Sequence, residues 1–172
     1  MNAISERSLK SPNWSAIVMF ALGFWLSGSL IIDFAIVPSL WVTGMMNLSG
    51  FASAGFTLFG IFNRIELLCA ALVLTGFLGL RFDRLITYSD RIQERLSLIL
   101  SGFLLVIPLI YTYFLTPQIS SLGLQLNFFE TTSTMPPAMI YLHEGYWLLE
   151  LVKFVVGVIL LRWCFRNSCT LG

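Results

Sequence analysis

The chain has 172 residues, of which 57% are hydrophobic and 11% are charged, and its formal net charge at pH 7 is +1. Soluble domains carry roughly 25% charged residues. A soluble fold of this length could not bury so much apolar surface, because surface grows nearly as fast as volume at this size. The composition therefore predicts a protein that lies in the lipid bilayer, and the charge excludes a basic surface for nucleic acid.

Four apolar runs are long enough to cross a bilayer as helices, which takes roughly 20 residues each. In chain order, the predicted spans are residues 14–37, 56–80, 96–116 and 141–163. Pro38 and Pro117 are expected to end the first and third helices, because proline lacks an N–H group and its ring clashes with the preceding turn.

Small residues recur within the first two predicted helices. Gly23 and Ser27 are four residues apart on the first helix, and Gly76 and Gly79 lie near the end of the second. Small side chains let transmembrane helices approach closely. We therefore predict close helix packing at these positions.

Lysine and arginine residues are distributed unevenly around the predicted spans. Segments 38–55 and 117–140 contain none. The basic residues near the helix ends all fall on the other side of the predicted bundle, at Arg7, Lys10, Arg81, Arg84, Arg91, Arg95, Arg162 and Arg166. Cytoplasmic segments carry this excess. The expected fold is a single domain over residues 1–172, an all-α integral membrane bundle of four transmembrane helices with cytoplasmic N- and C-termini.

Five ionisable residues fall inside the predicted spans, namely Asp33, Arg64, Glu66, Glu150 and Lys153. A charge near the bilayer centre costs roughly 2.5–3.5 kcal/mol on insertion scales, so such residues usually pair inside a bundle. Glu150 and Lys153 are three residues apart on one helix and can pair directly. Arg64 is expected to pair with Asp33, and Glu66 with Lys153. These residues predict a buried charge cluster between the first, second and fourth helices.

Three polar residues, His143, Glu144 and Tyr146, lie at the outer mouth of the fourth predicted helix. Met139 and His143 are four residues apart, and a thioether with an imidazole suits copper(I). Methionine is also an ordinary filler of apolar gaps, so this pair is a weak metal candidate and no metal or cofactor is predicted. The sequence contains no nucleophile–base pair or phosphate-binding loop, so an enzyme is not expected.

Two interpretations of the buried charge cluster remain open. Paired charges can fix the register and partner choice of helices. Alternatively, intramembrane ionisable groups can form a proton or ion path or a polar ligand pocket. Near-complete pairing favours the structural interpretation, whereas an unpaired carboxylate favours the functional one.

Three stretches resemble a four-helix membrane family of unknown function that includes the eukaryotic transmembrane protein 205 group. They are GFWLSGSLIIDFAIVP at 23–38, NRIE at 63–66, and LHEGYW at 142–147 followed by Glu150 and Lys153. The resemblance covers most of the chain and is greatest to cyanobacterial members. It implies a thylakoid or plasma membrane location, but no catalytic residue, because the family has no agreed activity.

These observations lead to three functional hypotheses. The first is a non-catalytic accessory or assembly protein that packs against other integral membrane proteins of a larger complex. The resemblance makes a photosynthetic complex a candidate partner. The second is a small transporter or ion-handling protein that uses the buried charge cluster. The third is a factor that handles lipid, haem or pigment.

Overall fold

The computed structural model describes residues 12–45, 48, 50–84, 91–129 and 137–169, and these residues form helices joined by short connections, with no strand among them. The elements in chain order are α1 (Trp14–Ile31), η1 (Ile32–Ile36), α2 (Val37–Val42), α3 (Phe51–Arg84), α4 (Arg91–Ile110), η3 (Tyr111–Leu115), α5 (Thr116–Phe129) and α6 (Pro137–Cys169). The labels η1 and η3 mark π-helical turns.

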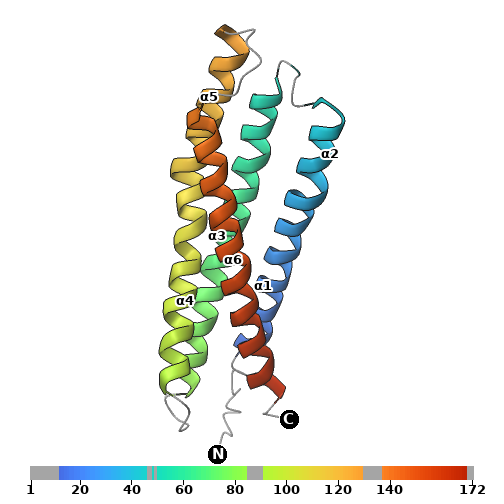
Figure 1. Cartoon of the computed structure of the whole chain (residues 1–172). Helices are drawn as coiled ribbons and strands as arrows, with labels where there is room; N and C mark the ends of the chain where they lie inside the picture. Colours follow the sequence, from blue (N-terminus) through green and yellow to red (C-terminus); the bar gives the residue numbers. More distant parts are fainter. Residues whose placement is uncertain (1–11, 46–47, 49, 85–90, 130–136, 170–172) are drawn as a thin grey trace, which may run out of the picture.

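These elements form an elongated bundle of long helical segments that run side by side (Figure 1). The first segment consists of α1, η1 and α2, and the third consists of α4, η3 and α5. Helix α1 packs against α3 and α6, and α4 packs against the same two helices. The start of α1 and the end of α6 lie at one end of the bundle, which we call the terminal end, and α2 and α5 lie towards the opposite, distal end.

The expectation that prolines end the first and third helices was wrong. The chain remains helical through Pro38 and Pro117 as far as Val42 and Phe129. Each proline is preceded by a π-turn, with one residue between them: η1 ends at Ile36 and η3 ends at Leu115. A proline ring clashes with the carbonyl four residues earlier in an α-helix. The wider π-turn adds a residue at that position, so that helical hydrogen bonding continues on both sides.

The backbone hydrogen bonds that close the two π-turns correspond to each other. The amide of Val37 donates to the carbonyl of Ile32, and the amide of Thr116 donates to that of Tyr111. Each bond spans five residues, as in a π-helix. The first and third segments therefore contain the same local irregularity at the same distance before a proline.

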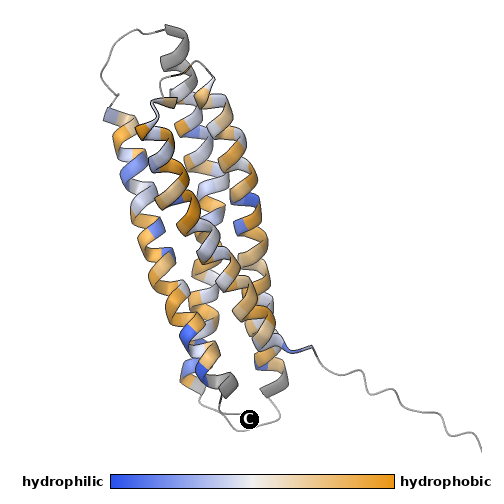
Figure 2. Ribbon diagram, turned by 90° about the vertical axis from the view of Figure 1, so that its right-hand side faces the viewer, coloured by the Kyte–Doolittle hydropathy of each residue, from blue (hydrophilic) through white to orange (hydrophobic). Residues whose placement is uncertain are grey.

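The outer surface of the bundle is apolar over most of its length (Figure 2). Large hydrophobic side chains such as Phe20, Leu72, Phe103 and Val155 are exposed there. Three helical segments, Trp14–Val42, Phe51–Phe82 and Ile92–Gly123, are long and apolar enough to cross a membrane. An apolar exterior of this extent is stable in lipid and not in water. The chain is therefore a multi-pass membrane protein.

Close helix packing is concentrated near the terminal end. A Cβ atom added to Gly79 would lie 2.5 Å from the Trp14 ring, and one added to Gly76 would overlap Val18. These contacts confirm the predicted close packing at Gly76 and Gly79, and they show that the neighbouring helix is α1. The prediction for the Gly23–Ser27 pair was wrong: Gly23 has open space around it and Ser27 is exposed.

Candidate functional site

Lys153 of α6 is fully buried near the middle of the bundle, at 0% exposure. Its ammonium nitrogen lies 2.6 Å from Oε1 of Glu66 on α3 and 2.6 Å from Oε1 of Glu150 on α6. It also donates a hydrogen bond of 2.8 Å to the Ser29 hydroxyl on α1. The expected pairing of both glutamates with Lys153 is therefore present, and it joins three helices through one cation.

Two residues of α1 contribute to this site although the sequence analysis did not select them. The indole nitrogen of Trp25 donates to Oε1 of Glu66 at 2.8 Å, and the Ser29 hydroxyl donates to the same oxygen at 3.1 Å. Trp25, Ser29 and Asp33 are spaced four residues apart, so they share one helix face. This polar stripe on an otherwise apolar helix is the signal that could have identified them.

Asp33 lies on η1 and is 3% exposed. Its Oδ1 accepts a hydrogen bond of 3.2 Å from the hydroxyl of Tyr146 on α6. Tyr146 precedes Glu150 by four residues on α6, or about one helical turn. Asp33 therefore extends the cluster around Lys153 towards the distal end of the bundle.

The expected pairing of Arg64 with Asp33 was wrong. Arg64 is exposed on the outside of α3, and no ion pair connects it to a carboxylate within the described residues. Residues two positions apart on an α-helix differ by about 200° around its axis. Because Glu66 faces the interior, Arg64 faces outward, and the donor that reaches Asp33 is Tyr146.

Removing Arg64 from the cluster leaves more carboxylates than cations. The ionised forms of Asp33, Glu66, Glu150 and Lys153 carry a formal charge of −2, and all four side chains are buried. One oxygen of each carboxyl group, Asp33 Oδ2, Glu66 Oε2 and Glu150 Oε2, receives no hydrogen bond from the described residues. Buried polar atoms are usually satisfied by protein or water. Each carboxyl group therefore uses only one of its two oxygens in hydrogen bonds with the described residues.

Aromatic rings enclose the cluster. Tyr111 of η3 is fully buried, and its ring centroid lies 5.6 Å from the Lys153 nitrogen and 4.9 Å from the Tyr146 ring centroid. The Tyr111 hydroxyl also lacks a hydrogen-bond partner among the described residues. Tyr111 was not predicted as a site residue. Both π-turns thus place one side chain at the site, and π-turns are frequent at functional sites.

The predicted outer-mouth residues separate into two groups. Tyr146 is half-buried at the cluster, whereas His143 and Glu144 are exposed on α6. Nδ1 of His143 lies 2.8 Å from the Met139 carbonyl oxygen of its own helix. In the part of the chain that the structure describes, no three His, Cys, Asp or Glu side chains gather as metal ligands. The Met139–His143 pair therefore forms no larger ligand set of that kind.

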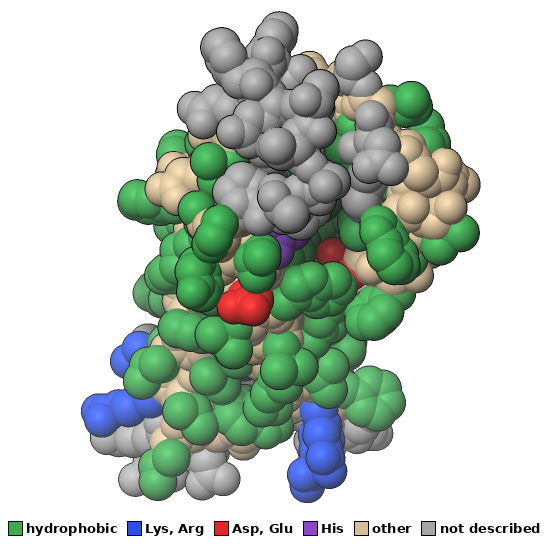
Figure 3. Space-filling view, turned by 45° about the horizontal axis from the view of Figure 1, so that its top comes forward, with side chains coloured by type: hydrophobic (Ala, Val, Ile, Leu, Met, Phe, Trp, Pro, Cys, Tyr) green, Lys and Arg blue, Asp and Glu red, His purple; other side chains and the backbone are tan. Residues whose placement is uncertain are grey.

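Charged side chains on the visible surface are also separated. Acidic side chains lie towards the middle of the face in Figure 3, and basic ones lie towards one end, with hydrophobic side chains between them. Besides Arg64 on α3, the exposed arginines of α3, α4 and α6 are Arg81, Arg95, Arg162 and Arg166. The first two basic residues, Arg7 and Lys10, and the side chains of Arg84 and Arg91 lie outside the described residues.

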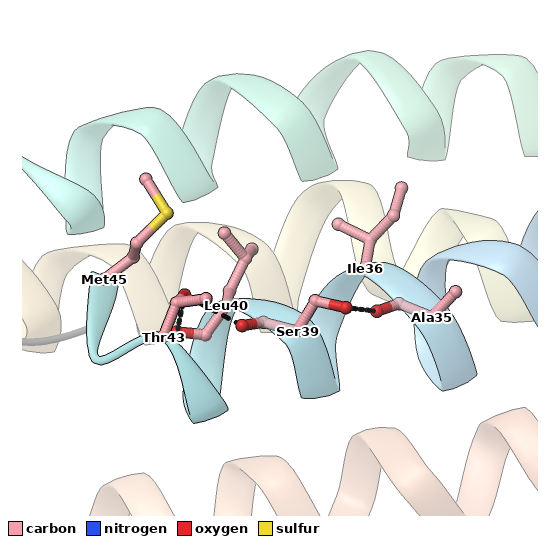
Figure 4. A pocket seen from close by; sticks show the side chains of 6 residues that line it. All are labelled: Ala35, Ile36, Ser39, Leu40, Thr43 and Met45. Atoms are coloured by element: carbon pink, nitrogen blue, oxygen red, sulfur yellow. Dashed lines mark hydrogen bonds between the residues drawn. The ribbon is translucent and has the colours of Figure 1, made fainter.

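A shallow groove runs along η1, α2 and the residues that follow, lined by Ala35, Ile36, Ser39, Leu40, Thr43 and Met45. Its two hydroxyl groups turn back to their own helix (Figure 4): Ser39 donates to the Ala35 carbonyl and Thr43 to the Ser39 carbonyl. These hydroxyl groups are thus engaged within the helix, and the remaining lining side chains are apolar. The buried charge cluster, not this groove, is the candidate site.

Comparisons of the chain with protein-family models, with curated proteins and with solved structures found no match. The resemblance to the transmembrane protein 205 group therefore stays a prediction. The functional argument rests on the geometry of the cluster.

Proposed function

We propose that this chain is an ion-handling membrane protein that binds protons or small cations at the buried charge cluster and moves them across the bilayer. The observation that carries this proposal is the charge imbalance: the cluster contains three buried carboxyl groups and one ammonium group, which pairs with only two of them. An uncompensated buried charge costs several kcal/mol. A positive charge from outside the chain would remove this cost, and ion binding supplies one.

The same imbalance weakens the structural interpretation. An accessory protein whose buried charges only fix helix register gains nothing from carboxylates beyond those that Lys153 can pair. Asp33 is such a carboxylate, since the donor it has among the described residues is the hydroxyl of Tyr146. No contact among the described residues supports accessory or assembly activity. None supports the handling of lipid, haem or pigment.

The proposal includes α6 as a fourth membrane span. This helix has 33 residues, or about 50 Å at 1.5 Å per residue. Two of its charged residues, Glu150 and Lys153, lie near its middle, and both are buried. Its outward side chains Leu148, Leu151 and Val155 are apolar and exposed. The face of α6 that would contact lipid is therefore apolar, as a membrane span requires.

We further propose that the terminal end of the bundle is cytoplasmic. The exposed arginines Arg81, Arg95, Arg162 and Arg166 belong to helix ends on that side. Positively charged residues near membrane spans are retained on the cytoplasmic side. A thylakoid or plasma membrane location follows from the family resemblance alone.

The test is ion flux in liposomes that contain the purified protein. Imposed gradients of protons, Na⁺ and K⁺ are followed with a pH-sensitive dye and with isotopes. Wild-type protein is expected to dissipate at least one gradient well above protein-free liposomes. Asp33→Asn is expected to reduce that flux about tenfold or more, because it removes the carboxylate in excess while leaving both glutamates paired with Lys153.

Arg64→Gln is the matched control, because Arg64 is a charged residue of the predicted cluster that the structure places on the outside. Its flux is expected to equal that of the wild type. The proposal fails if wild-type liposomes dissipate none of the three gradients faster than empty ones. It also fails if the two variants are equally active.

A further inference from the structure

The first and third segments have the same local irregularity but different surroundings. In each, a π-turn is followed by an α-helix whose second residue is a proline: η1 by α2, and η3 by α5. Both η3 and α5 pack against α3 and α6. Among the described elements, by contrast, η1 has close backbone contacts only with α1 and α2, which adjoin it in the chain, and α2 only with η1. The bundle therefore encloses this irregularity in the third segment and not in the first.

We call residues 32–42, the range of η1 and α2, the distal arm. No residue of α2 is buried, and Trp41 is 73% exposed. All the residues that line the groove beside the arm belong to residues 35–45, so no other helix contributes to it. In Figure 1, α2 stands apart from α3 at the distal end. Segments with few buried contacts move at low free-energy cost. Little packing therefore holds the outer part of the distal arm against the bundle.

A hydrogen bond and an aromatic contact connect the distal arm to α6. The Tyr146 hydroxyl donates a hydrogen bond of 3.2 Å to Oδ1 of Asp33. The rings of Phe34 and Trp147 meet edge to face, with their centroids 6.3 Å apart. Asp33 is buried, whereas Phe34 and Trp147 are both exposed. The hydrogen bond from Tyr146 thus connects the arm to α6 in the interior of the bundle, and the aromatic contact connects them on its surface.

The junction between η1 and α2 is suited to act as a hinge. Pro38 lies at this junction, and it has no amide hydrogen with which to close a helical hydrogen bond. Sharp bends in helices are usually located at prolines and π-turns. Pro117 gives the third segment the same hinge chemistry, but α5 is held there by α3 and α6. Bending is therefore expected in the first segment and not in the third.

We infer that the distal arm moves when the charge of the cluster changes, and that the hydrogen bond from Tyr146 to Asp33 controls this movement. A hydrogen bond to an ionised carboxylate is roughly twice as strong as one to a neutral acceptor. A proton or small cation bound at Asp33 therefore weakens the bond that holds the arm against α6. Lys153 does not compete with that ion, since its ion pairs are with Glu66 and Glu150. The inference rests on the proposed function for the ion, and it assigns the part of the molecule that moves.

Fluorine NMR of protein labelled with 5-fluorotryptophan tests this inference. The chain contains five tryptophans, of which Trp41 lies on the distal arm and Trp14 lies at the terminal end. Trp41 is eight residues beyond Asp33, or about 12 Å along the helix at 1.5 Å per residue. Its signal therefore reports movement of the arm and not a local change at Asp33. Each signal is assigned by replacing that tryptophan with phenylalanine.

Tyr146→Phe removes the donor and keeps the aromatic ring and every carboxyl group. It is expected to shift or broaden the Trp41 signal and to leave the Trp14 signal unchanged. Asp33→Asn, which removes the charge of the acceptor, is expected to shift the Trp41 signal in the same direction. Tyr113→Phe is the matched control, because Tyr113 is exposed on η3 and the same substitution there should leave Trp41 unchanged.

An unchanged Trp41 signal in both Tyr146→Phe and Asp33→Asn would overturn the inference, as would an equal change of Trp41 and Trp14. Wild-type protein gives a second measurement that needs no variant to fold. The ion that crosses the liposome membrane should move the Trp41 signal in the same direction when it is added to saturation, and an unchanged signal would overturn the inference.

The inference and the proposed function can fail separately. Ion flux in liposomes together with a Trp41 signal that never changes would remove the moving arm and leave the proposed function standing. A Trp41 signal that responds to both variants, without flux of any ion, would support control of the arm by the Tyr146–Asp33 hydrogen bond and contradict the proposed function.

Discussion

The two halves of the bundle are stabilised in different ways. In the terminal half, α1 approaches α3 closely at Gly76 and Gly79, and a Cβ atom at Gly157 of α6 would lie 2.9 Å from Leu26. The contacts at these three glycines are with apolar side chains and depend on the absence of a glycine side chain. In the middle of the bundle, by contrast, the same helices are connected by hydrogen bonds and ion pairs that converge on Lys153.

This difference indicates a division of roles. Packing between small and large apolar residues has one low-energy arrangement, whereas a carboxyl cluster has several protonation states. The terminal half is therefore suited to holding the helices together, and the cluster to changing its charge. The two regions should respond differently to substitution.

The largest effect is expected for Lys153→Met. Loss of the ammonium group leaves three buried carboxyl groups without a cation, and breaking a buried ion pair costs about 3–5 kcal/mol. Unfolding in detergent, measured by loss of helical signal with increasing denaturant, should show this decrease in stability. The double variant Lys153→Met/Glu150→Gln should recover part of it. Equal stability of the single variant and the wild type would contradict the central role of Lys153.

A smaller effect is expected for Gly79→Ala in the terminal half. The added methyl group meets rigid ring atoms of Trp14 at 2.5 Å, and overpacking typically costs about 1–3 kcal/mol. Gly60→Ala is the matched control, because Gly60 lies on the same helix and has no neighbour within 4 Å. The same unfolding measurement should show a loss for the first variant and none for the second. Similar values for both would mean that the helices do not depend on this contact.

Much of the fold could be predicted because it follows from average properties of the chain. Hydropathy located the helical segments, and the positions of Glu66, Glu150 and Lys153 predicted that they meet. The helix ends at Pro38 and Pro117 were predicted wrongly, since the local rule for proline does not include the compensating π-turn. The two prolines do indicate where site residues lie, because Pro38 follows Asp33 of η1 and Pro117 follows Tyr111 of η3.

The composition of the site was predicted less completely. Arg64 was included because it is charged, although its angular position relative to Glu66 placed it outside. Trp25, Ser29 and Tyr111 were not selected, because the cluster was predicted from charged side chains alone. Their role depends on the rotation of α1 and η3 relative to α6, which follows from packing between helices and not from local sequence.

The account depends most directly on whether Glu150 serves ion movement or only helix packing. Glu150→Gln should be measured for abundance in the membrane and for ion flux in liposomes in the same preparation. The account predicts normal abundance, because Lys153 keeps Glu66 as its partner, together with loss of flux. Reduced abundance with undiminished flux per molecule would contradict the account and assign the cluster a structural role.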